Sequence, residues 1–278
     1  VGVDIFAALT TGDNNTAVGS FALDANTTAS NNTAVGYSAL TANTTGTGNT
    51  AVGTLAGDAI TTGTYNTTSG YAAAGAVTTG DGNVCIGSQA GLDTVALTTG
   101  DYNVCIGTNT RTSAADGDNQ IVIGFDMTGQ GNNNFSFGNQ TTDSNIAFGA
   151  TSITAPSDVR LKEDIQDEEV GLSFINDLRP VTFQWKKEKD VPSEMRAHVA
   201  DSEERVMNGK YNHGFIAQEV KEVIDNHGLK DGFDMWTEDE TDGRQRIGEA
   251  SLMPLMVKAV QELSAKVEEL EDKLNNKE

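Results

Sequence analysis

A serine and a lysine that could act together stand five positions apart, at Ser157 and Lys162, in the stretch Ser-Asp-Val-Arg-Leu-Lys. A serine hydroxyl becomes a nucleophile when a base takes its proton, and a lysine can be that base if burial leaves its amine neutral. No histidine is near Ser157 in the sequence, so a Ser-His-Asp triad has no local support. The alternative is that Ser157 only caps a turn, with Asp158 and Arg160 in surface ion pairs.

The composition of the chain changes at this stretch. Residues 1–156 hold one basic residue, Arg111, and 11 acidic residues, all of them Asp, whereas residues 157–278 hold 17 basic and 29 acidic residues. Lys and Glu are absent before Pro156, and both Trp and all three His follow it. Such different compositions predict two folds that meet near residues 150–157.

The acidic balance and the hydropathy pattern exclude several classes of partner. A formal net charge of −22 argues against nucleic acid, because a protein that neutralises phosphates needs a basic face. No run approaches about 18 apolar residues, so we expect no membrane insertion. His198, His213 and His227 are not spaced as a metal site, and we expect no cofactor. Because Val1 lies inside a repeat, we expect further repeats before it.

The first half of the chain is a tandem repeat. The pentapeptide Asn-Thr-Ala-Val-Gly occurs three times and weaker copies follow, mostly at a period of 17 residues with departures in steps of three. A fixed period is the mark of a solenoid, and this unit is too short for a pair of helices. The pattern predicts an all-β parallel β-solenoid with one repeat per coil. The glycines that close the repeats are Gly19, Gly36, Gly53, Gly70, Gly87, Gly107, Gly124, Gly138 and Gly149.

Three features of the repeat indicate how a coil is built. The glycine provides a corner with positive φ, and the Asn four residues before it can form a ladder in which each amide bonds the next coil. The residue before the glycine is apolar in eight of nine copies, and stacked coils align such side chains about 4.8 Å apart. With about one large apolar side chain per coil, a single chain buries too little. We therefore expect a homotrimer whose three apolar faces meet on the axis.

The rungs Asn-Thr-Ala-Val-Gly and Asn-Val-Cys-Ile-Gly resemble those of trimeric autotransporter adhesin heads, which are trimers of left-handed β-rolls. The resemblance implies the same threefold architecture. Flat rows of Thr also allow an ice-binding solenoid, which the apolar rungs and the charged second half disfavour.

Two pairs of residues recur at equivalent repeat positions. Cys85 and Cys105 predict buried thiols on adjacent coils, with a disulfide as the alternative. Asp81 and Asp101 predict solvated turns, with a calcium site as the alternative.

The second half has the pattern of an α+β domain. Apolar spacing predicts a helix over residues 168–178, a strand over 181–186, and a short strand or turn that leads into a helix over 212–226. Residues 187–209 and 229–245 predict acidic loops or a solvated hairpin. From Met253 onward an alternating spacing of four and three predicts a trimeric coiled coil, with a seam of Met256, Val260, Leu263, Val267, Leu270 and Leu274.

Four ordered motifs, SDVRLKEDI, LRPVTFQWK, GFIAQEV and LMPLMVKAVQEL, precede or begin this seam. They resemble the C-terminal intramolecular chaperone of endosialidases and of other phage tail fibres and tailspikes. In that family the domain trimerises, guides folding of the β-rich trimer ahead of it, and then cuts itself off. The resemblance implies Ser157 as the nucleophile, Lys162 as the base, and cleavage between Pro156 and Ser157. Residues 246–252 depart from the family, which has a strand before the final helix.

These observations predict three domains: a β-solenoid at 1–152, a chaperone and autoprotease domain at 153–252, and a coiled coil at 253–278. We expect a phage tail-fibre or tailspike tip that binds a bacterial surface receptor, either a glycan or a protein. Its Ser-Lys peptidase would act once, in cis. The fibre would belong to the virion, and the chaperone domain would be released in the host cytoplasm. The alternatives are a bacterial trimeric surface adhesin with the same C-terminal chaperone and a glycan-degrading tailspike.

Overall fold

The computed structural model describes residues 2–92, 94–229, 235–239 and 241–276. The chain divides into two compact units, Val1–Glu163 and Asp164–Glu278. The predicted domain boundaries after residues 152 and 252 stay a prediction. Within the described ranges, no helix combines the length and the apolar composition that crossing a membrane requires.

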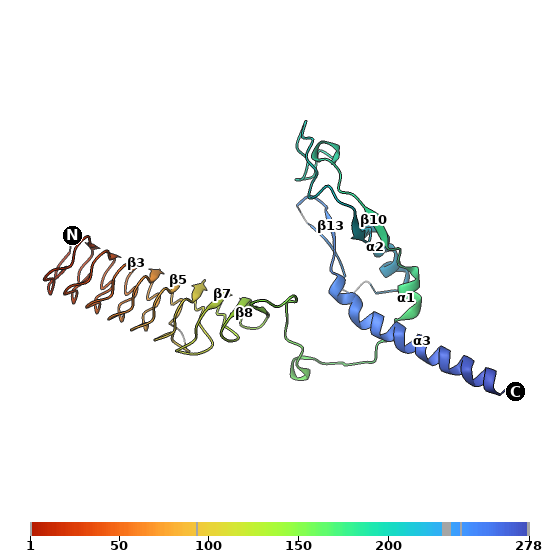
Figure 1. Cartoon of the computed structure of the whole chain (residues 1–278), viewed down its shortest axis with the longest axis horizontal. Coiled ribbons are helices and arrows are strands. Elements are labelled where there is room, and N and C mark those ends of the chain that lie inside the picture. Colours follow the sequence, from red (N-terminus) through yellow and green to blue (C-terminus); the bar gives the residue numbers. More distant parts are fainter. Residues whose placement is uncertain (1, 93, 230–234, 240, 277–278) are drawn as a thin grey trace. The chain divides into compact units, whose positions relative to one another are not determined.

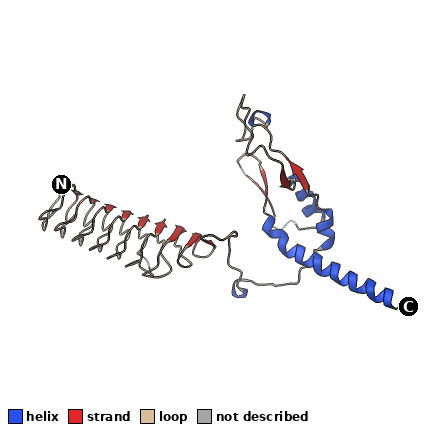
Figure 2. Ribbon diagram, viewed as in Figure 1, coloured by secondary structure: helices blue, strands red, loops and turns tan. Residues whose placement is uncertain are grey.

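The first unit is a β-solenoid whose strands stack in sequence order (Figure 1, Figure 2). Neighbours among β1 to β8 pair in parallel, and equivalent repeat positions face one another even where the repeat is longer or shorter than 17 residues. The predicted parallel β-solenoid is therefore confirmed. Its strands are β1 (Thr16–Val18), β2 (Thr33–Val35), β3 (Thr50–Val52), β4 (Thr67–Ser69), β5 (Val84–Ile86), β6 (Val104–Ile106), β7 (Gln120–Phe125), β8 (Asn134–Asn139) and β9 (Asp143–Ala147).

The last predicted repeat is not a coil. Strand β9 runs antiparallel to β8, with Phe135 opposite Ile146. Only 11 residues separate Gly138 from Gly149, which is too few to encircle the solenoid, so the chain folds back as a hairpin. The side chain of Asn139 shapes this turn by accepting hydrogen bonds from the backbone N–H groups of Thr141 and Thr142, each at 2.9 Å.

The interior of the solenoid is not the one that the sequence predicts. In each three-residue strand the middle side chain points inward and its two neighbours point outward, as alternation in a strand requires. The apolar residue before the glycine is therefore on the outside, and Val18 and Val52 are each 43% exposed. Most coils contribute another large apolar side chain to the core, so the expected count of one per coil is too low for them. These buried side chains include Leu23, Leu40, Ile60, Val77, Leu97 and Met127.

A ladder of buried Asn side chains runs through the solenoid, as predicted. The Oδ1 atom of Asn49 accepts a hydrogen bond from the backbone N–H of Asn66 at 2.9 Å, and Asn66 does the same for Asn83. The Nδ2 group of Asn66 donates to the carbonyl oxygen of Gly80 in the next coil at 2.8 Å. Each side chain thus satisfies a backbone donor and a backbone acceptor of the next coil, which is what makes its burial tolerable.

The closing glycines are required by both conformation and space. Gly36 has φ of 142°, and a Cβ there would lie 2.3 Å from the carbonyl oxygen of Gly53. A side chain at this corner would therefore push adjacent coils apart, which confirms the role that the repeat predicts for its glycine.

Cys85 and Cys105 are buried, free thiols that face each other on β5 and β6, as predicted. The hydrogen bond with Cys105, together with burial, raises the pKa of Cys85 well above its usual value.

Asp81 and Asp101 belong to a second ladder of side chains that link adjacent coils. Their Oδ1 atoms accept hydrogen bonds from the backbone N–H groups of Thr64 at 2.6 Å and of Asp81 at 2.7 Å.

The second unit combines two shorter helices and one long C-terminal helix with two antiparallel strand pairs, β10 with β11 and β12 with β13. The last pair lies in the segment for which a loop or hairpin is predicted; residues 230–234 and 240 of that segment lie outside the described residues. The elements are α1 (Leu172–Asp177), β10 (Val181–Phe183), η2 (Glu188–Asp190), β11 (Asn212–Gly214), α2 (Ala217–Asn226), β12 (Trp236–Glu238), β13 (Gln245–Ile247), η3 (Glu249–Ser251) and α3 (Leu252–Asn275).

Helix α1 is shorter than predicted because it begins after Gly171. A Cβ on Gly171 would lie 2.7 Å from Cγ of Lys258 on α3, so the backbone here packs directly against that helix. The carboxylate of Glu262 on α3 accepts a hydrogen bond from the backbone N–H of Leu172 at 3.0 Å. This contact satisfies one of the free donors at the start of α1.

Helix α3 has two apolar sides, of which one is buried and the other is exposed. Leu252, Leu255 and Ala259 are buried, and Leu252 and Leu255 lie in one core cluster with Phe174, Val220 and Ile224. The predicted heptad seam faces away from this core, and all six of its side chains are exposed: Met256, Val260, Leu263, Val267, Leu270 and Leu274. The long C-terminal helix is thus present, while its assembly into a trimeric coiled coil stays a prediction.

Candidate active site

The segment that carries Ser157 follows the end of the solenoid. A bridge between Asn145 and Thr154 is the last strand-like contact before it, with the N–H of Thr154 donating to the carbonyl oxygen of Asn145 at 2.7 Å. Beyond this bridge Ala155, Pro156 and Ser157 have neither helical nor strand structure. Pro156 and Ser157 are exposed, so the peptide bond between them is open to attack from solvent or from a neighbouring side chain.

A single 3-10 turn, η1 (Val159–Leu161), brings Lys162 back toward Ser157. The backbone N–H of Lys162 donates to the carbonyl oxygen of Val159 at 3.2 Å and closes the turn. The side chain of Lys162 then reaches Ser157, and Nζ donates a hydrogen bond to Oγ at 2.8 Å. The structure therefore brings together the two residues that the sequence singles out. Their catalytic roles stay a prediction.

Asp158 and Arg160 hold the turn in place. Oδ1 of Asp158 accepts a hydrogen bond from the backbone N–H of Arg160 at 2.9 Å, and Oδ2 pairs with the Arg160 guanidinium at 2.6 Å. The hydrogen bonds from this guanidinium and backbone lower the pKa of Asp158. The surface ion pair considered as an alternative is thus present, but the residue that caps the turn is Asp158 and not Ser157. Because Asp158 caps the turn, the Ser157 hydroxyl can accept the hydrogen bond from Lys162.

The protonation state of Lys162 decides what this pair can do. A charged lysine only donates, as in the observed contact, and it cannot take the proton of the hydroxyl. A neutral amine at the same position could accept the Oγ–H and leave an alkoxide beside the Pro156 carbonyl. Both side chains are exposed in the single chain, and burial is what favours the neutral form of a lysine in proteins generally.

The three His side chains lie at separate places in the second unit. His198 Nδ1 is 2.8 Å from the carbonyl oxygen of Val191, and His227 Nε2 is 2.8 Å from Oδ2 of Asp177. His213 lies in β11. Over the residues that the structure describes, no group of His, Cys, Asp or Glu side chains is arranged to hold a metal ion.

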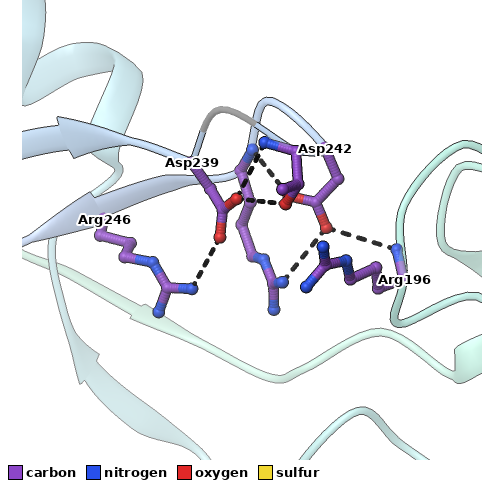
Figure 3. A network of polar contacts seen from close by, with 6 residues as sticks. Arg196, Asp239, Asp242 and Arg246 are labelled. Carbon is purple, nitrogen blue, oxygen red and sulfur yellow. Dashed lines mark hydrogen bonds and ion pairs between the residues drawn. The ribbon is translucent and has the colours of Figure 1, made fainter.

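A polar network at the β12–β13 turn is a feature that the sequence analysis missed (Figure 3). Asp239 accepts hydrogen bonds from the hydroxyl and backbone of Thr241 and pairs with Arg246 at 3.1 Å, and these contacts lower its pKa. Asp242 pairs with Arg244 at 3.1 Å and accepts from the backbone N–H of Arg196 at 3.4 Å. The network joins the hairpin to the loop before β11. The Asp242-Gly243 pair, a hairpin signal, could have located this turn.

Residues 157–229 match the family model described as chaperone of endosialidase, which is about a quarter of the chain. No curated protein and no solved structure matched. The match supports the predicted chaperone domain, while the resemblance of the rungs to adhesin heads stays a prediction. It begins at Ser157, the residue whose hydroxyl contacts Lys162.

Proposed function

We propose that this chain is a segment of a homotrimeric fibre joined to its own folding chaperone, and that the chaperone separates itself by cutting the Pro156–Ser157 bond. The observation that carries the proposal is the 2.8 Å contact between Lys162 Nζ and Ser157 Oγ at the first residue of the family match. The family description supports the chaperone role, and the contact supports a reaction at its N-terminal boundary.

The chaperone role also fits two kinds of exposed apolar surface. The α3 seam leaves Leu263 and Leu270 in solvent in the single chain, which is the pattern of a helix that lacks its partners. The solenoid coils carry exposed Val and Ile beside their closing glycines. Parallel sheets form slowly, and an incomplete stack exposes strand edges and apolar side chains that aggregate. A helical trimer that forms first would hold three chains in alignment while the solenoid folds.

The cut would proceed in balanced steps. Neutral Lys162 takes the proton of the Ser157 hydroxyl, and Oγ forms a bond to the carbonyl carbon of Pro156. The C–N bond between Pro156 and Ser157 then breaks, and Lys162 returns the proton to the leaving amine. Pro156 is now held as an ester on Ser157 Oγ. Water hydrolyses the ester, which releases a Pro156 carboxylate and a chain that begins at Ser157 with its hydroxyl restored.

In this proposal cleavage occurs only after the three copies have assembled. Because the pair is exposed in one chain, packing of the copies around residues 155–162 would exclude water and favour the neutral lysine. The peptidase would act once, in cis, and would have no other substrate.

The fibre is proposed to be the tip of a phage tail fibre or tailspike that binds a glycan or protein on the bacterial surface. The family description, which names an endosialidase, supports this setting. The fibre would belong to the virion, with the chaperone released in the host cytoplasm. Neighbouring genes for tail and baseplate proteins are expected, and a membrane-anchoring segment elsewhere in the full-length protein would favour a bacterial adhesin instead.

Expression of residues 1–156 alone, beside the full chain, tests the chaperone role. The full chain should give a soluble trimer by light scattering, whereas the isolated solenoid should give aggregate or monomer because it folds without alignment. A soluble, heat-resistant trimer from residues 1–156 alone would show that the solenoid needs no chaperone.

A further inference from the structure

One face of the solenoid differs from the rest of its surface. It consists of four rows of residues that lie five, three and one positions before each closing glycine and one position after it; we call it the uncharged face. In the coil of β4 these residues are Tyr65, Thr67, Ser69 and Tyr71. Across the coils of β1 to β8 the rows contain only Asn, Gly, Ser, Thr, Tyr, Val, Ile and Phe.

The two outer rows flank the strands: Tyr65 lies in a bend before β4, and Tyr71 lies in a turn after the closing glycine Gly70. Backbone hydrogen bonds between coils continue past the three-residue strands on both sides. Tyr65 donates its N–H to the carbonyl oxygen of Thr47 at 3.0 Å, and the carbonyl oxygen of Tyr71 accepts from the N–H of Gln89 at 2.8 Å. The tyrosines therefore lie on the two flanks of the three-residue strand and are linked to the neighbouring coils by backbone hydrogen bonds.

The exposed apolar side chains of the solenoid collect on this face. Tyr65 is 71% exposed and Tyr71 is 54% exposed, and exposed apolar side chains that gather on one surface mark an interaction site. Between residues 10 and 125, every large apolar side chain that the structure describes as exposed lies in one of the four rows: Val18, Tyr37, Val52, Tyr65, Tyr71, Ile86, Tyr102, Ile123 and Phe125.

Charge decides which partner can cover this surface. All 11 acidic residues of the solenoid lie outside the four rows, and the positions that border the rows carry Asp in some coils, as at Asp81, six residues before Gly87, and Asp126, two residues after Gly124. A second copy of an acidic chain is repelled wherever it presents like charges. It can approach closely only where both surfaces carry none.

We infer that the uncharged face is the surface by which three copies of the solenoid pack against one another, in parallel and with equal coils at equal height. This inference rests on the proposed homotrimer and adds which surface forms it. In a threefold assembly each interface is heterologous, so one flank of a copy meets the opposite flank of the next. Tyr71 of one copy would then lie against Tyr65 of the next.

The composition of the β4 coil fits the proposed contact between flanking tyrosines of neighbouring copies. Its central positions are polar, Thr67 and Ser69, where the other coils of β1 to β8 have at least one apolar residue. The same coil carries a tyrosine on each flank. The flanking rings would supply the apolar contact that the centre of this coil lacks.

A cysteine pair in the full chain tests the contact. The background is Cys85→Ala with Cys105→Ala, because Ala34 and Ala51 fill the same row in other coils. Tyr65→Cys with Tyr71→Cys, treated with a short bifunctional maleimide, should give a covalent trimer on a denaturing gel. Either single variant should give no covalent trimer, since each copy then offers one thiol. Thr62→Cys with Ala76→Cys, in the same coil but outside the four rows, should also give none.

Tyrosine iodination of the wild-type protein gives a second measurement that needs no variant. Tyr37, Tyr65, Tyr71 and Tyr102 should react on the order of tenfold more slowly in the trimer than in the denatured chain, because an interface excludes the reagent. If light scattering shows a trimer but these rings react at the denatured rate and the cysteine pair forms no covalent trimer, the assignment of the face is wrong and the homotrimer stands. A monomer by light scattering would instead overturn the homotrimer and this inference with it.

Discussion

Lys162 Nζ lies 2.8 Å from Ser157 Oγ, and the two residues lie on either side of one short 3-10 turn. A nucleophile and its base that share a turn are positioned without any other part of the fold. The bond that Ser157 would attack is its own peptide bond to Pro156, so the reacting groups are adjacent in the chain. What the single chain does not provide is a dry environment, since both side chains are exposed.

Removal of either member of the pair should abolish cleavage and leave assembly intact. Ser157→Ala removes the nucleophile, and Lys162→Met removes the base. Lys162→Arg should fail as well, because a guanidinium stays protonated and cannot accept the proton. The measurement is a denaturing gel of purified protein after incubation, with light scattering to show that the trimer is retained.

Ser152→Ala is the matched control for these variants, because it removes an exposed hydroxyl from the same segment. It should cleave like the wild type. Cleavage at an undiminished rate in Lys162→Arg would show that Lys162 is not the base.

A charge in the α3 seam should prevent trimer formation. Leu263 is exposed in the single chain and lies on the seam, so Leu263→Lys would place three ammonium groups in the proposed coiled-coil core. Light scattering should then report monomer or aggregate. Gln261→Lys adds the same charge two residues away, off the seam, and should remain trimeric. If both variants stay trimeric, the seam is not the assembly surface.

The Asn ladder predicts a large stability loss from a small substitution. Asn66→Ala leaves the N–H of Asn83 and the carbonyl oxygen of Gly80 without their side-chain partners in the interior. Unsatisfied buried groups of this kind should lower the free energy of unfolding by about 2–4 kcal/mol per copy. Thr62→Ala, at an exposed position of the same coil, should change it by less than about 0.5 kcal/mol. Denaturant unfolding followed by circular dichroism measures both, and equal losses would contradict the ladder's role.

Glu203 should titrate far below an ordinary glutamate. Hydrogen bonds from Lys187 and Lys189 lower its pKa from 4.5 to about 2. A lowered folded-state pKa means that the stabilising contact is complete above pH 4.5 and is lost as the pH falls toward about 2. Carboxyl-carbon NMR should give the low midpoint, and the double variant Lys187→Met with Lys189→Met should return it toward 4.5. A wild-type midpoint near 4.5 would mean that the contacts do not persist in solution.

The repeat made the solenoid predictable, because a buried Asn and a closing glycine recur where each coil needs a hydrogen-bonding side chain and a tight corner. The direction of the apolar residue before the glycine was not predictable in the same way. The strands are three residues long, so Val18 and its equivalents show too short an alternation to separate inside from outside. The inward position of Leu23 and Leu40 was not recognisable from the repeat, because Gly57 and Gly91 occupy the same repeat position in later coils.

The candidate site also has one part that the sequence could predict and one part that it could not. The types and order of Ser157 and Lys162 could be found from the motif, but a separation of five residues does not place two side chains together in a strand or on one face of a helix. The contact depends on η1 and on the Asp158 cap, which are local features of the turn. The shortened α1 depends on a tertiary contact, the close approach of Gly171 to α3, and a single-helix pattern cannot show it.

Intact-mass spectrometry of the wild-type protein tests the central claim most directly. The purified full chain, incubated as an assembled trimer and then denatured, should yield two fragments, one ending at Pro156 and one beginning at Ser157, while Ser157→Ala should stay whole. If the denatured wild type remains a single species of 29.3 kDa after long incubation, the Ser157–Lys162 pair does not cut this chain.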